Sequence, residues 1–272
     1  MDILQYTFFQ NAIWASVLIS IACGIIGTYV VSRRIVFISG GITHASFGGL
    51  GIGFYMGINP ILSALVFSVL AAFGVEYLNH SGSHKRIRED SAIAAIWSLG
   101  MAIGVIFIFL TPGYAPNLSA YLFGNILTVS KADIVWMAVL AITTLLIYIF
   151  GRKLIIYTAF DRDFAITQRL PVRFIEYLMM ALIATTIVLS IRLIGIMLLM
   201  SLITIPQMTA NMFTSDYNKI TITSCILALL GCISGLFLSY SFNIPSGAFI
   251  ILVLIAIFLL AKAFQIIIVR RD

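Results

Sequence analysis

The chain has 272 residues, of which 61% are hydrophobic and only 10% are charged, and its mean hydropathy is +1.11. A soluble domain carries about 25% charged residues, so this composition excludes a soluble fold. In a soluble protein the net charge of +6 would suggest an anionic partner such as nucleic acid. Here the basic residues cluster at the ends of apolar segments, so we expect a lipid bilayer and no nucleic acid.

In chain order, nine apolar segments are long enough to cross a bilayer as helices, at about 20 residues per crossing. The predicted crossings are 11–31, 35–57, 61–78, 91–110, 133–150, 174–190, 193–213, 220–240 and 248–268. This pattern predicts an all-α, polytopic integral membrane helical bundle with its N-terminus outside, forming one transmembrane domain over residues 1–272. Eight crossings is the alternative count, because a short or re-entrant segment within 174–213 would remove one.

The distribution of basic residues predicts the orientation of the chain. With the N-terminus outside, only Lys131 and Arg192 fall on the outer side, which leaves fourteen of the sixteen Lys and Arg residues on the opposite side. Cytoplasmic loops of membrane proteins carry an excess of Lys and Arg, so the side with fourteen is predicted to be cytoplasmic.

A polar loop at about residues 152–173, RKLIIYTAFDRDFAITQRLPVR, lies on the predicted cytoplasmic side. It is mixed in charge and long enough for one or two short helices. One interpretation is a solvated linker. The other is a docking element for a cytoplasmic partner. A chain without a soluble domain needs a surface through which a protein outside the bilayer can drive its movement.

His44 lies well inside the second predicted crossing, in the run FISGGITHASFGGLGIGF. Ionisable side chains within a membrane are costly, so each one suggests a function. Four glycines at helical spacing fall on or beside the His44 face and would leave room next to the imidazole: Gly40, Gly41, Gly48 and Gly51. Imidazole binds divalent cations such as zinc, and hydroxyls of the nearby Thr43 and Ser46, or water, could complete the shell.

The same glycines also allow a purely structural interpretation. Gly49 and Gly53 have the small-xxx-small spacing that lets two membrane helices approach closely. In that case His44 would hydrogen-bond across the helices and hold no metal. Taken alone, the residues favour this second interpretation.

Two further places are candidates for a polar pathway. Glu76 lies near the inner end of the third crossing, where it is either a channel residue or, as its position favours, an interfacial carboxylate. Pro206 removes a backbone donor within the seventh crossing and predicts a kink or break. Because broken membrane helices either line a cavity or pack against protein, Ser201, Thr204 and Gln207 beside the proline are candidate pathway residues.

Several catalytic signatures are absent from the sequence. There is no GxxxxGK[ST] phosphate loop, no HExxH pair and no GxSxG elbow, so neither a nucleotide hydrolase nor an intramembrane enzyme is indicated. The small polar inventory favours a conduit over a catalyst. A secondary carrier or channel that works without nucleotide is one form such a conduit could take.

Five runs of sequence, in this order, carry a resemblance to a known family. They are VSRRIVFISGGITHASFGGLGIGFYMGINP, EDSAIAAIWSLGMAIGVIF, AYLFGNILTVSKADI, AFDRDFAITQRLPV and RLIGIMLLMSLITIPQMTANMF. Together they resemble the permease subunit of the metal-ion ABC importers, which take up zinc, manganese or iron, over residues 31–213. The combination of the HAS run at His44 with the YLFG run at 121–124 is the most specific part.

The resemblance implies a transport subunit that is not itself an enzyme, in the inner membrane of a bacterial cell. Its partners would be a second permease chain, with a homodimer expected, a cytoplasmic ATP-binding subunit and an extracytoplasmic metal-binding protein. A divalent metal ion would be the transported substrate, with zinc the first candidate and manganese or iron the alternatives, and no cofactor would be bound permanently.

The resemblance also implies roles for particular residues. His44 would correspond to the family's intramembrane histidine on the ion path, and the loop after Ala159 would contain the helix that docks on the ATPase. The docking residues would be Ala159, Phe160, Asp161, Asp163, Phe164, Ala165, Arg169, Leu170 and Pro171. Two positions depart from the family pattern: Gly40 stands where an aspartate is frequent, which bears on metal selectivity, and Arg169 stands where a glycine is usual.

Overall fold

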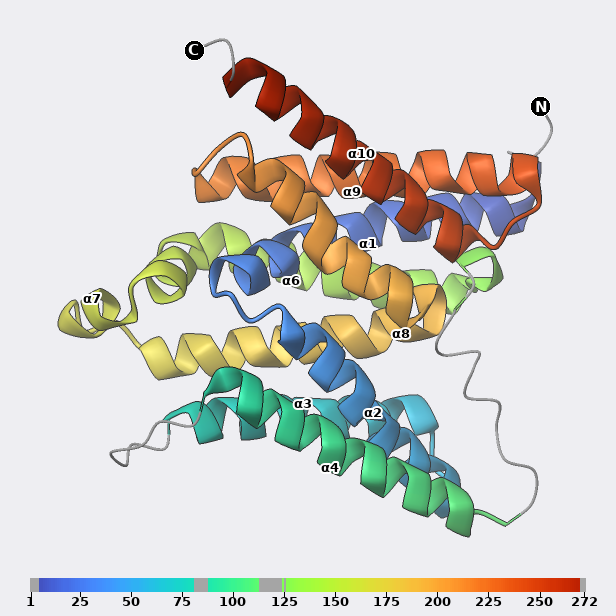
Figure 1. Ribbon diagram of the computed structural model, residues 1–272. Coiled ribbons are helices and arrows are strands. Elements are labelled where there is room, and N and C mark those ends of the chain that lie inside the picture. The colour runs from blue at the N-terminus through green and yellow to red at the C-terminus, as the bar shows by residue number, and fades with distance from the viewer. Residues whose placement is uncertain (1–4, 81–87, 113–123, 125, 270–272) are drawn as a thin grey trace. The chain divides into compact units, whose positions relative to one another are not determined.

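The computed structural model describes residues 5–80, 88–112, 124 and 126–269, and within these ranges the chain is helical with no strand. This confirms the predicted all-α class. The helices are α1 (Thr7–Ser32), α2 (Phe37–Met56), α3 (Pro60–His80), α4 (Glu89–Leu110), η2 (Ile126–Thr128), α6 (Lys131–Phe160), α7 (Arg162–Thr167), α8 (Val172–Asn211), α9 (Tyr217–Phe242) and α10 (Ser246–Val269) (Figure 1). Lys85, Arg86 and residues 120–123 of the AYLFGNILTVSKADI run lie outside the described residues.

Each of the nine predicted crossings overlaps a long helix, with α8 accounting for two of them. In the described part of the chain, eight segments are long and apolar enough to span a membrane. The ninth, α2, is not among these eight. It is a helix of 20 residues whose many glycines, together with His44 and its hydroxyl residues, lower its hydropathy. Both segments of α8, Val172–Ile191 and Leu193–Asn211, are among the eight, so the loss of a crossing within 174–213 that the alternative count assumed was wrong. The counts of nine and eight differ in the glycine-rich α2.

The chain forms two compact units. The first unit contains Met1–Ser32, Ala120–Arg152 and Arg192–Asp272, and the second contains Arg33–Ser119 and Lys153–Ile191. Both α6 and α8 therefore contribute to each unit. Because the relative placement of the two units is not defined, each is described by itself.

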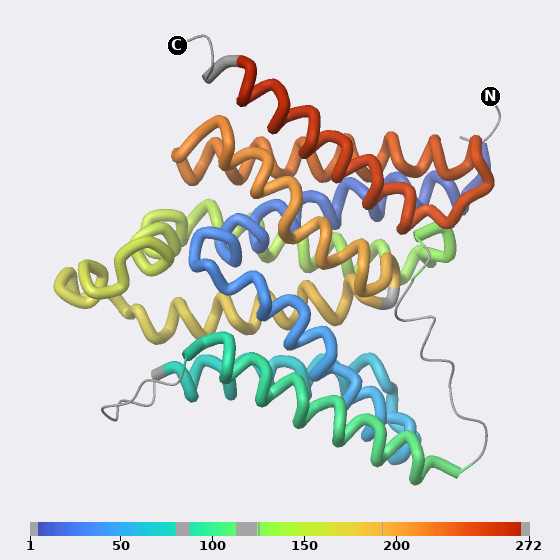
Figure 2. Tube along the Cα trace, in the orientation of Figure 1, coloured from blue at the N-terminus to red at the C-terminus, as the bar shows by residue number. Residues whose placement is uncertain are grey.

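In the first unit, α1 packs against α9, and α9 forms a helical hairpin with α10 (Figure 2). Glycines make these contacts close. A Cβ atom on Gly24 would lie 3.0 Å from the Cα of Cys225 on α9, and one on Gly235 would lie 2.6 Å from the Cα of Ile250 on α10. Backbones that approach so closely gain dispersion contacts that lipid cannot replace, which is the usual basis of helix association in membranes.

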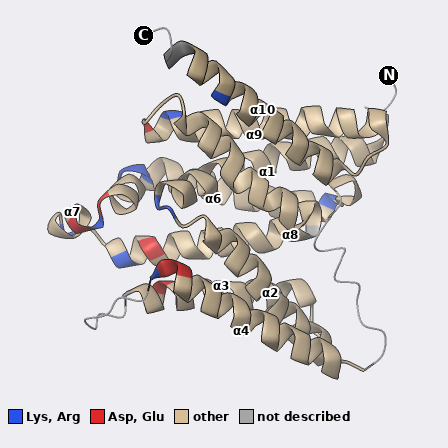
Figure 3. Cartoon of the chain, viewed as in Figure 1, with Lys and Arg blue, Asp and Glu red and all other residues tan. Residues whose placement is uncertain are grey.

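In the second unit, α2 packs against both α3 and α4. We refer to these three helices as the α2–α4 block. The short helix α7 and the part of α8 up to Ile191 belong to the same unit. Charged residues of this unit lie where α3 ends and where α4, α7 and α8 begin (Figure 3). This agrees with the sequence argument, which assigned Arg33, Arg162 and Arg173 to one side of the membrane.

The backbone of α8 departs from helical geometry at Gly195, with φ 75° and ψ 167°, and not at Pro206. The break that the sequence predicted at the proline is thus in a different place. Gly195 adopts a positive φ that only glycine tolerates readily, whereas Pro206 stays inside the helix. Gly124 meets this break, since a Cβ atom there would collide with the backbone of Ile194 and Gly195. Packing within the first unit therefore requires a glycine at this position of the YLFG run.

Candidate metal pathway and coupling segment

The glycine faces of α2 are covered by its neighbours. A Cβ atom on Gly51 would lie 2.6 Å from the carbonyl oxygen of Gly104 on α4, and one on Gly49 would lie 2.5 Å from that of Ser63 on α3. The open space expected beside Gly48 and Gly51 is therefore occupied, by Phe67 of α3 and Gly100 of α4 at Gly48 and by Gly104 of α4 at Gly51. Close helix approach, the alternative interpretation of these glycines, describes their packing.

His44 is half buried, and its ring stacks on Trp97 of α4 with centroids 4.4 Å apart and an interplanar angle of 2°. Its Nδ1 atom is buried and makes no hydrogen bond within the described residues. The same is true of the hydroxyl of the neighbouring Thr43, whereas Ser46 donates to the carbonyl oxygen of Thr43. Gly40 is buried on the same helix. A buried polar atom without a partner is costly and requires an explanation.

The chemistry available at this place is that of one imidazole with small polar neighbours. The described residues contain no group of three or more His, Cys, Asp or Glu side chains that could hold a metal ion. A permanent metal centre requires about four protein ligands, or three with water. A single imidazole can give a passing divalent ion one ligand, and the remaining ligands would come from water or hydroxyl groups.

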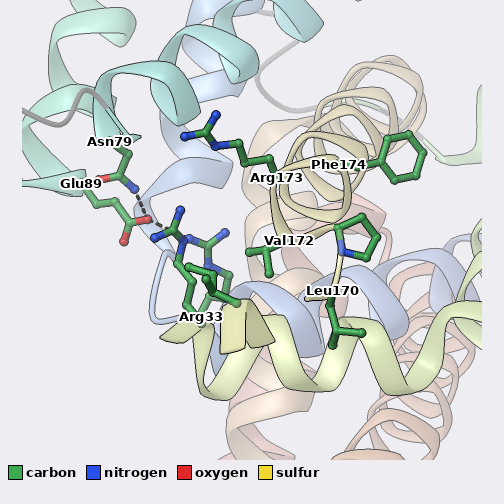
Figure 4. Close-up of a pocket in the computed structure, with 10 residues that line it drawn as sticks. Arg33, Asn79, Glu89, Leu170, Val172, Arg173 and Phe174 are labelled. Carbon is green, nitrogen blue, oxygen red and sulfur yellow. Dashed lines mark hydrogen bonds and ion pairs between the residues drawn. The ribbon is translucent and has the colours of Figure 1, made fainter. Parts of the chain in front are cut away.

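Glu76 is fully buried, and it belongs to a cluster of charges at the end of the α2–α4 block. Its Oε1 atom lies 3.8 Å from Nη1 of Arg33, the residue that follows α1. The other guanidinium nitrogen, Nη2, lies 3.3 Å from Oε1 of Glu89 and 3.9 Å from Oε1 of Glu176. Asn79 also donates to Glu89 (Figure 4). Glu76 is thus a buried carboxylate in an ion pair with an arginine, and both interpretations of its role stay predictions.

Sequence reasoning missed this cluster. In the sequence, Glu76, Glu176 and Arg33 all lie near ends of crossings on the predicted cytoplasmic side, but that they would contact one another was not foreseen. A usable signal existed, because a carboxylate at the edge of a span on the positive side needs a cation to offset its burial. Which cation it takes depends on helix packing.

A cavity of about 820 Å³ lies beside the cluster. Its charged lining comes from Arg33, Glu89, Arg162 and Arg173, while residues 170–172 and Phe174 supply an apolar side (Figure 4). The cavity thus lies between the charge cluster and the segment that leads from α7 into α8.

The predicted docking segment folds as the end of α6 followed by α7. Asp161 caps α7, because its carboxylate accepts a hydrogen bond of 2.8 Å from the backbone N–H of Phe164. Ala165 is fully buried, whereas Phe160 is 60% exposed and Phe164 is 44% exposed. The residues predicted here by resemblance therefore lie together in one short stretch that exposes two aromatic rings.

The segment ends in a left-handed residue. Arg169 has φ +55°, and the N–H of the following Leu170 donates to the carbonyl oxygen of Ala165. A left-handed residue just after a helix is most often glycine. The glycine that the resemblance implies at this position would suit this geometry, whereas Arg169 adopts it under strain. Pro171 then precedes α8, in keeping with the preference for proline shortly after a helix end.

The residues around Pro206 belong to the first unit, whereas His44 belongs to the second. Ser201 and Thr204 donate their hydroxyl hydrogens to carbonyl oxygens one turn earlier in α8, at 3.0 and 2.7 Å. Gln207 is fully buried, and its Nε2 donates to the carbonyl oxygen of Cys23 on α1 at 2.9 Å. The Gln207 hydrogen bond joins α8 to α1 within the first unit, whereas those of Ser201 and Thr204 stay within α8. A pathway role for the three residues stays a prediction.

In the described part of the chain, eight segments long and apolar enough to span a membrane define the class of the protein as a multi-pass helical membrane protein. The chain matches the ABC 3 transport family over residues 5–265, and it belongs to that family.

Relatives and a solved structure agree with this assignment. An uncharacterized membrane protein of Synechocystis sp. is 40% identical over 262 residues, covering 96% of this chain and 92% of the relative. A manganese transport system membrane protein of Listeria monocytogenes is 31% identical with the same coverage. The structure of PsaBC from Streptococcus pneumoniae in complex with Fab contains a chain with a TM-score of 0.82 and 29% identity, covering 96% of this chain and 93% of that one. The chain is thus a permease of a metal-ion ABC importer.

Proposed function

We propose that this permease moves manganese into the cytoplasm of a bacterial cell, using ATP hydrolysed on a separate subunit. The observation that carries the choice of ion is the similarity over nearly the whole chain to relatives named for manganese transport. Zinc, the first candidate from sequence, lacks such support, although zinc, iron and manganese all accept imidazole and oxygen ligands. The proposed partners are a cytoplasmic ATP-binding subunit, an extracytoplasmic metal-binding protein and a second copy of this chain, all at the inner membrane.

His44 is the proposed contact for the ion. Its buried Nδ1, together with the hydroxyl of Thr43, offers polar atoms that lack partners in the described residues. An ion that passes through must be bound weakly enough to leave, and one imidazole without a neighbouring carboxylate meets that condition. The stacked ring of Trp97 holds the imidazole in one plane and so limits the ways in which it can turn.

The proposed contact with the ATPase is made by residues 159–161, 163–165 and 169–171, and it does not include Arg162, which binds Glu176 within the permease. Exposed aromatic rings at Phe160 and Phe164 on a short capped helix suit insertion into a groove of another subunit. Asp163 and Arg169 are exposed polar residues of the same segment and would lie at the rim of such a contact.

The test uses proteoliposomes that contain the permease together with its ATP-binding subunit and metal-binding protein. We expect uptake of manganese that requires ATP, and His44→Ala should lower this uptake at least about tenfold while assembly stays intact, the effect expected for the loss of an interaction worth about 1.4 kcal/mol. Thr186→Val is the matched control, because it removes a buried hydroxyl from the second unit outside α2.

Other outcomes would contradict the proposal in separable ways. Transport by the permease alone, driven only by a gradient, would favour a secondary carrier. ATP-driven uptake of zinc or iron in preference to manganese would refute the choice of ion but leave the importer. Unchanged uptake in His44→Ala would remove His44 from the pathway.

A further inference from the structure

We propose that Glu176 is a positioning residue that transmits movement of α7 to the α2–α4 block, through a carboxylate shared between Arg162 and Arg33. This inference rests on the proposed function, in which the segment containing α7 receives movement from an ATPase. It assigns the link between that segment and the helix that carries His44 to particular side chains.

The first step of the argument is that one oxygen atom serves two arginines. Oε1 of Glu176 accepts a hydrogen bond of 3.0 Å from Nε of Arg162, the first residue of α7. The same Oε1 lies 3.9 Å from Nη2 of Arg33. Glu176 is on α8, so a single carboxylate on one helix joins the docking helix to the connection between α1 and α2.

The second step is that Arg33 connects Glu176 to the three helices of the α2–α4 block. Arg33 lies just before α2, and its guanidinium also pairs with Glu76 on α3 and Glu89 on α4. Every helix of the block is thus attached to Arg33, α2 through the chain and the other two through ion pairs. Arginine suits this position because its planar group presents donors in several fixed directions.

The third step is burial, which makes these pairs hard to separate. The side chains of Glu76 and Glu176 are fully buried, and that of Arg33 is only 11% exposed. Separating a buried pair leaves an uncompensated charge, whereas an exposed pair exchanges its partner for water at little cost. When α7 moves, Glu176 and Arg33 are therefore constrained to follow it.

The fourth step is that the three helices of the α2–α4 block are packed too closely for one of them to move without the others. A Cβ atom on Gly100 of α4 would lie 2.5 Å from the Cα of Ala45 on α2, and one on Gly49 of α2 would lie 2.6 Å from the Cα of Ala64 on α3. Closely packed helices shift as bodies and do not deform continuously. A displacement applied at Arg33 therefore moves the stacked pair of His44 and Trp97 with the block.

A competing explanation is that Arg162, which is 33% exposed, touches the ATPase directly. Glu176 separates the two explanations because it is fully buried and cannot meet a partner subunit. A docking role predicts that only changes at Arg162 matter. A transmitting role predicts the same defect from either side of the pair.

The experiment uses the reconstituted permease with its ATP-binding subunit and metal-binding protein, and it measures assembly, ATP hydrolysis and manganese moved per ATP. For Arg162→Gln and Glu176→Gln we expect assembly and hydrolysis within about twofold of the wild type. Manganese moved per ATP should fall at least about fivefold, the lower limit of a typical coupling between sites. The double variant should be no worse than either single variant, and Arg162→Lys, which keeps the cation, should restore most of the ratio.

Arg88→Gln is the matched control, because Arg88 is 86% exposed in an ion pair with Asp90 at the same end of the unit and should leave the ratio unchanged. Loss of assembly in Arg162→Gln alone, with a normal ratio of manganese to ATP, would assign Arg162 to docking and overturn the proposal. An unchanged ratio in both Gln variants would also overturn it.

Failure of the proposed function can be told apart from failure of this inference. If the wild-type assembly moves no metal with ATP, hydrogen exchange on the purified permease still tests the link. Faster exchange at both α7 and the start of α2 in the two Gln variants supports it. Faster exchange confined to α7, or no change at all, overturns it.

Discussion

The two units bury polar groups of different kinds. In the first unit, Gln207 is fully buried and donates to Cys23 of α1, and the buried polar side chains described there are neutral. In the second unit, Glu76 and Glu176 are fully buried against arginines. Both units use glycines to bring backbones together, so the difference between them lies in charge and not in packing.

This difference indicates which of the two units is better suited to transmit motion. A neutral hydrogen bond contributes about 1 kcal/mol and can break alone, which suits a fixed contact between two helices. A buried ion pair resists separation, because each member depends on the other for its charge to be tolerated. The unit that contains His44 also contains the charges that connect its helices to α7, in the segment proposed to dock on the ATPase, and the predictions below test that contrast.

The largest expected effect is the loss of Arg33. Arg33→Met would leave the buried carboxylates of Glu76 and Glu176 without a guanidinium that both approach, and we expect a loss of about 3–5 kcal/mol in the free energy of unfolding. Gln207→Met in the first unit removes a neutral donor of similar size and should cost about 1 kcal/mol. Reversible unfolding in mixed detergent micelles measures both changes.

Arg34→Met serves as the control, because Arg34 is exposed beside Arg33 and its replacement should change the free energy of unfolding by less than about 0.5 kcal/mol. If Arg33→Met and Gln207→Met lowered the free energy of unfolding equally, the buried charges of the second unit would depend on their partners no more than the neutral groups of the first unit do. The contrast between the units would then disappear.

The next effect is smaller and concerns the packing that both units share. A Cβ atom on Gly104 would lie 2.6 Å from the carbonyl oxygen of Phe47, so Gly104→Ala should destabilise the protein by about 1–3 kcal/mol. Gly27→Ala in the first unit, with a Cβ 2.5 Å from the carbonyl oxygen of Ile203, should have a similar cost. Gly74→Ala meets only the tip of Ile96 at 3.4 Å and should stabilise α3 by about 0.5–1 kcal/mol.

The same detergent unfolding assay measures these three variants. A gain from Gly104→Ala comparable to that from Gly74→Ala would show that α2 and α4 can separate without penalty. That result would contradict the rigid block on which the link from Arg33 to His44 depends.

Much of the fold was accessible from the sequence, because hydropathy and helix length are local properties. The crossings, their number to within one, and the gathering of Arg33, Arg162 and Arg173 at one end followed from apolar runs and the sorting of basic residues. The break in α8 was misplaced because Pro206 is a visible helix breaker, whereas nothing local to Gly195 announces φ 75°. At this point the backbone of α8 lies against Gly124, which is distant in sequence, so the contact could not be read from the residues around Gly195.

Part of the candidate site could also be predicted from the sequence, because it depends on local properties of the chain. His44 was found because an ionisable residue inside an apolar run stands out. The space expected around it was not found, because periodicity shows which face the glycines occupy but not that Gly100 and Gly104 of another helix would fill it. The charge cluster joins residues from four separate segments, so only tertiary structure could reveal that Glu176 serves two arginines.

The smallest expected effect lies at the end of α7, where sequence and geometry disagree. Arg169 adopts φ +55°, which costs a residue with a Cβ about 1 kcal/mol, so Arg169→Gly should slow hydrogen exchange of the Leu170 amide about fivefold. Gln168→Gly is the control: Gln168 has φ −78°, so glycine there adds only backbone entropy to the unfolded loop and should speed the same exchange. Faster exchange in Arg169→Gly would mean that the arginine side chain makes contacts that outweigh its backbone strain, and α7 would then be held by its end as well as by Arg162.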